Sequence, residues 1–565
     1  GAAARVGRTG GQPQGAAAAL IDLDRDLMKL LVRRSTLVSR MRGGKDNAST
    51  PAAIQAEKAV RVAGEAGALA FSRDPRFSRQ LFALLQDIKV MGKAEAQKAN
   101  SFRLTPSKAA VNAAITGPTS SRGAQMRLAL AAALGRPLVL EGVTLSPALL
   151  DAARALAQAG AAITHESTGS GIGRVSLQAG GKFAFTNKTL YVGDDLFTLY
   201  LLAFMAVGKT GACRFNGGAR LKAADLSPLR QALPLFGARL AHVIPRSQGA
   251  PANVESSGYI PPLVVVPADL PLEGICALLL APLAWGAPLT LNLAALPAVI
   301  ATAALSEVRP LHREVGAEVE TQGPHLVFTP GPLQPPSRPL LPLEPALAAY
   351  LLALPAFSGG SFTLYGRWPS SMPEAQEAEQ LLAFAGLSLS HGGRADGEES
   401  VTSSRLSAAL DAPLHGNDIS SRLGPLLLAL CAHKKATGAE LPPLDGLPFP
   451  QDDVEKALAG EFFARAGFYS GAAGLEPAPA EDGEAPAWTS PDPYWSMAYA
   501  LAAFHRPGLR LANPGNIGEV LPFFWNVYNG LPEPSDPARQ PPEKTEETSD
   551  RPARRRIIAG GPDRS

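Results

Sequence analysis

The chain is poor in the residues that build metal sites and disulfide frameworks. It has 565 residues but only three cysteines and eight histidines. Cys213, Cys276 and Cys431 are far apart, odd in number and set in apolar runs, which predicts small buried side chains rather than disulfides. No CxxC or HxxxH spacing occurs. We therefore expect no metal, no cofactor and a reducing, cytoplasmic compartment.

The chain also lacks an excess of either charge and a continuous membrane span. Fifty-three basic and fifty acidic residues give a formal net charge of +3, so no global field favours nucleic acid or an anionic membrane. Residues 274–305 are uncharged, but Pro282, Gly286 and Pro297 interrupt them. A lipid-exposed helix broken this often would leave backbone groups unpaired in hydrocarbon. We expect no nucleic-acid partner and no transmembrane helix.

Both ends of the sequence lack the apolar residues that a packed core needs. Residues 1–17 have no hydrophobic stretch typical of a signal peptide. Residues 531–565 are rich in proline and mixed charge, and burial there would not offset the entropy lost on ordering. We predict that both segments are disordered.

A repeated pattern organises the rest of the chain. In five segments a helical apolar periodicity runs into a glycine and then into a short alternating stretch, with the glycines 70 to 81 residues apart. Each glycine is predicted to end its helix in the left-handed conformation, and the alternation predicts a half-buried strand. The glycines are Gly160, Gly237, Gly316, Gly386 and Gly467.

About 30 residues before each of these glycines lies a second, more apolar segment, such as 197–207. Helices as apolar as these must lie inside a helical layer beside sheets. A further copy at 495–504 completes six units, each with two helices and about three strands. The period predicts an α/β fold in which repeated units bury apolar helices against one another.

Six such units resemble the enolpyruvyl transferase family. The resemblance implies two domains of three units each, which would be residues 117–331 and residues 102–116 plus 332–530. Within the family the motifs are more similar to the EPSP synthase branch, which implies phosphoenolpyruvate and shikimate 3-phosphate as substrates and a place in the shikimate pathway. Both substrates are polyanions, so their site needs several Lys or Arg forks and helix N-termini.

Two basic motifs match that expectation. In TSSRGAQMRLALAAAL, Arg122 and Arg127 resemble the family's cations around a helix N-terminus. In GGARLKAADL, Arg220 and Lys222 resemble the turn that holds phosphoenolpyruvate, although Ala224 stands at its third cation. The alternative is that both motifs are solvated pairs at a helix start and in an exposed loop.

Other positions depart from the family pattern. The general acid or base would have to come from Asp194 or Asp418, or from another carboxylate of the cleft, and Asp418 equally fits a helix or turn cap. Asp452 and Asp453 fit first-turn acids of a helix better than a site. Cations of the family pattern are replaced by Tyr200, Val454, Tyr494 and Glu519.

Residues 18–98 predict three helices and resemble the all-helical chorismate mutase domain. Arg34 lies on an apolar seam, where its stem either snorkels to solvent or binds an anion inside the helices. With Lys45, Lys89 and Lys93 it would form a cationic pocket, although the family's set is incomplete. The resemblance implies catalysis, metabolite binding or homodimerisation through these helices.

Two functions of different classes therefore remain open. The first is an EPSP-synthase-like enolpyruvyl transferase fused to a chorismate-mutase-like domain, with Arg122, Arg127, Arg220 and Lys222 holding the substrates. The second is a catalytically degenerate paralogue that binds a metabolite or a partner protein of the same pathway.

Overall fold

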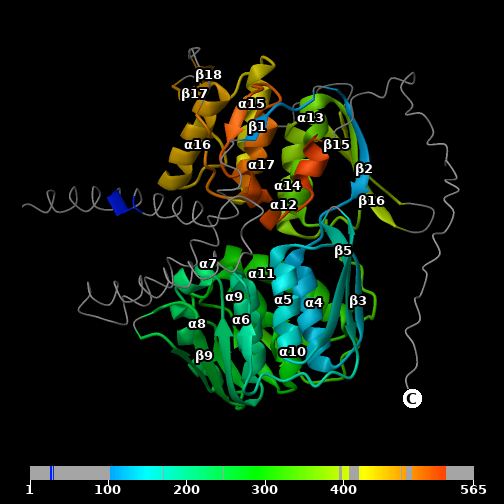
Figure 1. The fold of residues 1–565 in the computed structure, drawn as a ribbon, viewed down its shortest axis with the longest axis vertical. Helices are drawn as coiled ribbons and strands as arrows, with labels where there is room; N and C mark the ends of the chain where they lie inside the picture. The colour runs from blue at the N-terminus through cyan, green and yellow to red at the C-terminus, as the bar shows by residue number, and fades with distance from the viewer. Residues whose placement is uncertain are drawn as a thin grey trace, which may run out of the picture.

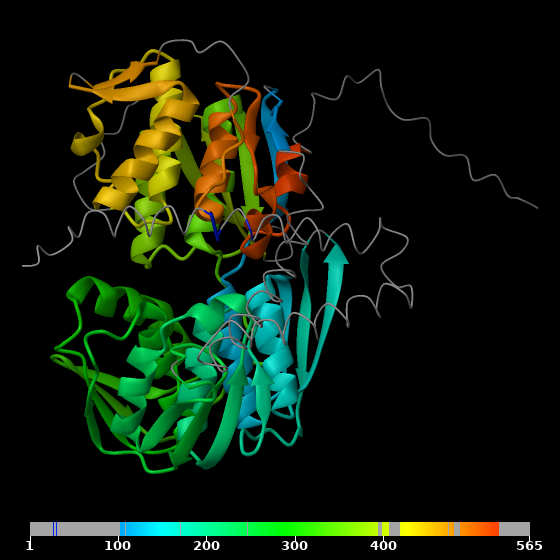
Figure 2. The same ribbon diagram turned by 60° about the vertical axis from the view of Figure 1, so that its left-hand side comes forward.

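The protein is described by a computed structural model, which places residues 26, 27, 30, 102–107, 109–169, 171–245, 247–393, 398–405, 419–472, 474–478 and 486–529. Buried apolar side chains form two separate cores. The first lobe is built around the core from Ala124 to Leu341. The second lobe is built around Leu104, Val111 and the core from Leu343 to Tyr528. The two lobes are stacked, the first cyan to green and the second mainly yellow to orange (Figures 1 and 2).

Three four-stranded sheets share one strand order, in which a parallel pair continues into two antiparallel strands. A repeated sequence pattern thus folds into a repeated sheet. In the first lobe these strands are β6 (Thr189–Tyr191), β7 (Thr210–Asn216), β9 (Ala252–Ser257) and β8 (Ala238–His242), then β10 (Leu263–Val265), β11 (Leu289–Asn292), β13 (His325–Thr329) and β12 (Glu318–Gln322). In the second lobe they are β2 (Val111–Thr116), β14 (Gly360–Tyr365), β16 (Glu399–Arg405) and β15 (Leu387–Gly393).

The other strands form three smaller antiparallel sheets. One of these sheets joins two segments that are far apart in the sequence, because Phe102 pairs with Leu511. The sheets are β3 (Leu138–Thr144), β5 (Ile172–Gln178) and β4 (Ala162–Gly169); β1 (Phe102–Leu104) and β19 (Leu509–Leu511); and β17 (Phe468–Gly471) and β18 (Gly474–Pro477).

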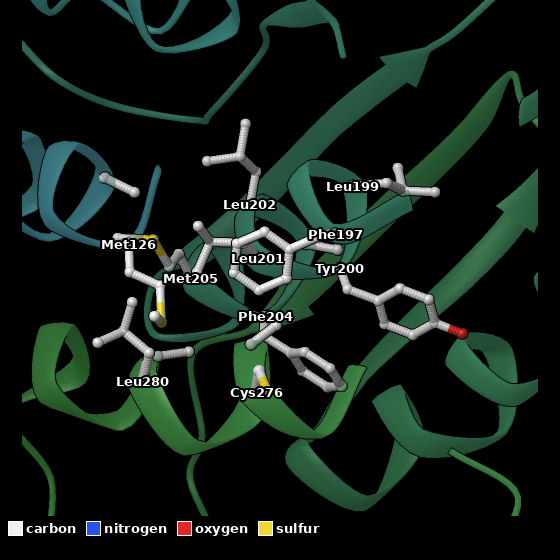
Figure 3. Close-up of a cluster of buried hydrophobic side chains, with 14 of the residues drawn as sticks. Met126, Phe197, Leu199, Tyr200, Leu201, Leu202, Phe204, Met205, Cys276 and Leu280 are labelled. Carbon is white, nitrogen blue, oxygen red and sulfur yellow. The ribbon is translucent and has the colours of Figure 1, made fainter. Parts of the chain in front are cut away.

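Apolar helices occupy the centre of each lobe. Every residue of α6 (Leu196–Val207) from Phe197 onward is buried, and Figure 3 shows its side chains against Met126 and Cys276. Full burial of each large apolar side chain stabilises the fold by about 1.5–3 kcal/mol, which explains why α6 carries no charge. The other central helices are α4 (Ser121–Leu134), α9 (Leu272–Leu280), α12 (Pro345–Leu352), α15 (Gly424–Ala436) and α17 (Pro493–Ala502).

The remaining helices cover the sheets or end the units. Asp452 caps one of them, α16, because its carboxylate accepts a hydrogen bond from the Glu455 amide at 2.8 Å, so the predicted helix-start role of this acid is confirmed. These helices are α5 (Pro147–Gln158), α7 (Ala219–Ala223), α8 (Ser227–Ala232), α10 (Pro282–Trp285), α11 (Ala298–Glu314), α13 (Leu354–Ser358), α14 (Pro373–Phe384), α16 (Asp453–Ala466) and α18 (Phe524–Asn529), with short 3₁₀ turns η1 (Leu233–Phe236), η2 (Leu444–Gly446) and η3 (Pro514–Glu519).

The helix-ending glycines behave as predicted. All five have φ between 66° and 104°, and each is followed within two residues by a strand. The three cysteines are free and buried, as expected. The mixed α/β class is confirmed, whereas the division into six units and the domain limits stay predictions. Within the described residues, no helix is both long enough and apolar enough to cross a membrane.

Candidate functional site between the lobes

A cavity of about 160 Å³ lies where the two lobes meet. The first lobe contributes the start of α4, the residues before α6 and the middle of α11, and the second contributes residues that precede or begin its central helices. Two arginines and four carboxylates line it. They are Arg122, Asp195 and Glu307 from the first lobe, and Arg422, Glu344 and Glu519 from the second.

Arg122 is placed in the cavity by the start of α4. The helix begins there because the Ser120 hydroxyl accepts a hydrogen bond from the Gly123 amide at 3.0 Å. The Arg122 guanidinium donates to both oxygens of Glu307, at 3.0 and 2.8 Å, and lies over the Phe197 ring at 5.2 Å. A second carboxylate, Glu273, lies 3.5 Å away. Burial alone would lower the pKa of Arg122, but these carboxylates raise it above its usual value.

Arg127 lies one turn further along the same helix and is also paired. Its guanidinium donates to Glu314 at 2.9 and 2.5 Å, and to the Gly123 carbonyl at 3.1 Å. Only 8% of its side chain is exposed. The helix start thus carries two cations as predicted, but both are bound to glutamates of α11 rather than solvated.

The second basic motif lies on the short helix α7. Asp194 holds this turn, because its Oδ1 accepts hydrogen bonds from the Arg220 and Leu221 amides at 2.9 and 3.2 Å. The Arg220 side chain reaches across to the second lobe and donates to Glu519 at 2.8 Å. Lys222 is half-buried in the same turn. Asp194 therefore holds the turn that carries Arg220, and the Arg220 side chain pairs with a residue of the second lobe.

Arg422, which sequence reasoning missed, is the second arginine of the cavity. It lies just before α15 and donates through Nε to Glu374 at 2.9 Å and through Nη1 to Glu344 at 2.8 Å. Its Nη2 also donates to Glu374, and its guanidinium lies 6.0 Å from the Tyr494 ring. Its side chain is 39% exposed. No motif signalled this residue, because its partners lie 48 and 78 positions away in sequence.

Glu374 is the most perturbed carboxylate of the site. It is only 14% exposed, and burial raises its pKa to about 7 despite the neighbouring Arg422, with the Glu344 charge raising it further. Deprotonation there would leave two carboxylates on one arginine in a low-dielectric wall, which is why the charged form is disfavoured. A carboxyl group that titrates near neutral pH can exchange a proton under ordinary conditions.

Two of the positions that depart from the family pattern lie at this cavity, because Tyr494 and Glu519 line it. Tyr200 instead is buried in the first core, where burial raises its pKa, and Val454 is 69% exposed. The substitutions were identified from the sequence, but their convergence required the fold.

Some predicted site residues lie outside the described residues. Asp418 is one of them, as are the four residues of the chorismate-mutase-like pocket: Arg34, Lys45, Lys89 and Lys93. In the described part of the chain, no group of three or more His, Cys, Asp or Glu side chains could hold a metal ion.

No protein-family model and no curated protein matches the sequence. Among solved structures, the fold is that of the enolpyruvyl transferases. An EPSP synthase from Acinetobacter baumannii matches with a TM-score of 0.57 and 15% identity, over 76% of this chain and 98% of that one. A second structure of that enzyme gives 0.55 and 15%, over 76% and 97%. The enolpyruvyl transferase NikO from Streptomyces tendae gives 0.53 and 17%, over 76% and 96%.

Proposed function

We propose that the cavity between the lobes is a ligand-binding site that does not perform enolpyruvyl transfer, so that the protein acts as a metabolite- or partner-binding regulator of the shikimate pathway. One observation carries this proposal. Among the residues that the structure describes, each of the four arginines at or beside the cavity is already bound to a glutamate of the same chain. They are Arg122, Arg127, Arg220 and Arg422.

The energetics follow from these pairs. Phosphoenolpyruvate and shikimate 3-phosphate would each need several unpaired cations. Replacing a charge-assisted hydrogen bond by none costs about 1.5–3 kcal/mol, and like charges held close add repulsion. Glu519 lies on the cavity wall where the family pattern has a lysine, so a negative charge replaces a positive one there. Three or four such losses would weaken polyanion binding by many orders of magnitude.

The enolpyruvyl transferase fold and the presence of Arg122 in the cavity support a second candidate, an active EPSP-synthase-like transferase. It would require Glu307 and Glu519 to release their arginines when the substrates bind. Its acid and base would come from Asp418 or Asp194, of which Asp194 is hydrogen-bonded to the α7 turn. The chorismate-mutase-like pocket and the homodimer stay part of both candidates as predictions.

A phosphate-release assay separates the two. The full-length chain is incubated with phosphoenolpyruvate and shikimate 3-phosphate, beside an active EPSP synthase as the positive control. We expect no release above the protein-free rate and, at pH 8, no thermal shift with either substrate. Release that requires both substrates and disappears in Arg122→Ala would establish the transferase and reject the regulator.

A further inference from the structure

Two arginines of the cavity, one from each lobe, are held in the same way. Each guanidinium donates to both oxygens of one glutamate, has a second carboxylate beside it and lies over an aromatic ring. Each cluster therefore joins one guanidinium to two carboxyl groups. The clusters are Arg122 with Glu307 and Glu273, and Arg422 with Glu374 and Glu344.

The carboxylate on Arg422 occupies the place that an anionic ligand would take. A guanidinium binds carboxylate, phosphate or sulfate most strongly through two parallel N–H groups, and Nε and Nη2 of Arg422 are both directed to Glu374. The arginine itself remains 39% exposed and lines the cavity. An anion entering the cavity would thus compete with the charge of Glu374 for the same face.

We infer that Glu374 couples anion binding in the cavity to proton uptake: Arg422 accepts a small oxyanion or carboxylate when Glu374 is protonated and excludes it when Glu374 is charged. This inference rests on one part of the proposed function, which is that the cavity between the lobes is a ligand-binding site. It adds a ligand class and a mode of regulation to that proposal.

The groups around Glu374 leave it as the one that titrates. Burial raises its pKa to about 7, whereas the pKa of Arg422 is raised well above its ordinary value, so Arg422 stays charged. Burial raises the pKa values of Tyr494 and Tyr350, which stay neutral. The groups that face Glu374 are Arg422 and Ser420 before α15, Glu344 and Tyr350 at α12, Tyr494 on α17, Glu307 on α11 across the cavity and Glu377 on its own helix.

Glu377 does not compete for this role. Burial raises its pKa as well, but its carboxylate accepts a hydrogen bond from the Ser420 amide at 3.0 Å, and the Arg422 charge lowers its pKa. Glu307 is bound bidentately to Arg122 on the other lobe. Protonation of Glu374 is therefore the change that removes a competing negative charge from the Arg422 guanidinium.

Sulfate is a suitable probe because its own charge is constant between pH 6 and pH 8. We would measure its binding to the full-length chain by isothermal titration calorimetry in two buffers of different ionisation enthalpy. If only the protonated form binds, a pKa near 7 predicts affinity about tenfold higher at pH 6 than at pH 8. It also predicts uptake of nearly one proton per sulfate at pH 8. Equal affinity at the two pH values, or no binding at either, would overturn the inference.

Variants assign the proton to its site. Glu374→Gln should bind sulfate at pH 8 as tightly as the unmodified chain does at pH 6, with no proton uptake, and Arg422→Met should not bind it. Glu461→Gln is the matched control, because that glutamate pairs with Arg465 within α16 and should leave the pH dependence unchanged. A correctly folded Glu374→Gln, checked by circular dichroism, that keeps the tenfold pH dependence would contradict us. Turnover in the phosphate-release assay would reject the proposed function but not this linkage.

Discussion

At the residue scale, the cleft shows how a glutamate can take over an arginine that a ligand would otherwise use. Arg422 is held by Glu374 and Glu344, and Arg122 by Glu307. Such pairs bring little net stability, because desolvating the charges offsets their attraction. Removing one partner is costly, since it leaves a charge in a poorly solvated wall.

Arg422→Met should therefore destabilise the protein by about 3 kcal/mol at pH 8. The loss should be smaller at pH 6. Because the pKa of Glu374 is raised in the folded state, its protonated form is favoured at low pH, and the repulsion with Glu344 grows as the pH rises through 7. Urea unfolding followed by circular dichroism measures both values. Arg239→Met is the control, because that pair with Glu255 is 72% exposed at the arginine and should cost less than about 1 kcal/mol.

Two half-buried histidines with buried ring nitrogens make the second lobe sensitive to acid. His433 and His505 have ring centroids 6.4 Å apart, and burial lowers the pKa of each to about 4. The unfolded chain binds their protons more tightly, so stability should fall as the pH drops from 6.5 to 4. His505→Phe removes one of these histidines, so its unfolding free energy should change less steeply with pH than that of the unmodified chain. The difference in slope should correspond to about one proton taken up on unfolding. An unchanged slope, equal to that of the exposed control His391→Phe, would contradict this account.

At the scale of the element, five helical segments end at a glycine with positive φ that precedes a strand. The left-handed φ is unfavourable for any residue with a Cβ, but the space around the glycine differs from unit to unit. At Gly160 a Cβ would lie 2.3 Å from the Lys182 carbonyl oxygen, whereas at Gly316 it would meet nothing within 4 Å. The two sites separate backbone strain from steric overlap.

Gly316→Ala should cost about 1 kcal/mol, the effect of backbone conformation alone. Gly160→Ala should cost at least twice as much, because the carbonyl must also move. Both values come from urea unfolding of the full-length chain. Equal losses for the two variants would show that the neighbouring segment yields without penalty.

At the scale of the whole molecule, the lobes are joined by ionic contacts as well as by the chain. Arg220 of the first lobe and Glu519 of the second pair at 2.8 Å, with 58% and 40% of their side chains exposed. An exposed pair of this kind contributes less than about 1 kcal/mol to stability.

Charge reversal tests this contact. In Glu519→Arg two guanidiniums would face each other, and we expect the radius of gyration measured by small-angle scattering to increase. Adding Arg220→Glu should restore the original value, because the pair is re-formed with opposite polarity. Arg239→Glu, which breaks a pair within the first lobe, should not change the radius. A double variant as expanded as the single one would exclude the pair as a link between the lobes.

Much of the fold could be predicted from the sequence, and less of the site. The helix-ending glycines and the apolar segment 197–207 give local signals that act within a few residues. Arg122 and Arg220 were found because each belongs to a short motif. Arg422 and Glu374 were missed, because their pairing joins residues 48 positions apart.

The sequence by itself determined the α/β class, the left-handed helix ends and the buried cysteines, because backbone conformation and apolar periodicity are local properties. It also showed that cations of the resembled family were replaced. Only the tertiary structure decided where the remaining arginines direct their donors. Ion pairing depends on which distant carboxylates the packing of the lobes brings within about 3 Å, and here those carboxylates belong to glutamates of the chain itself.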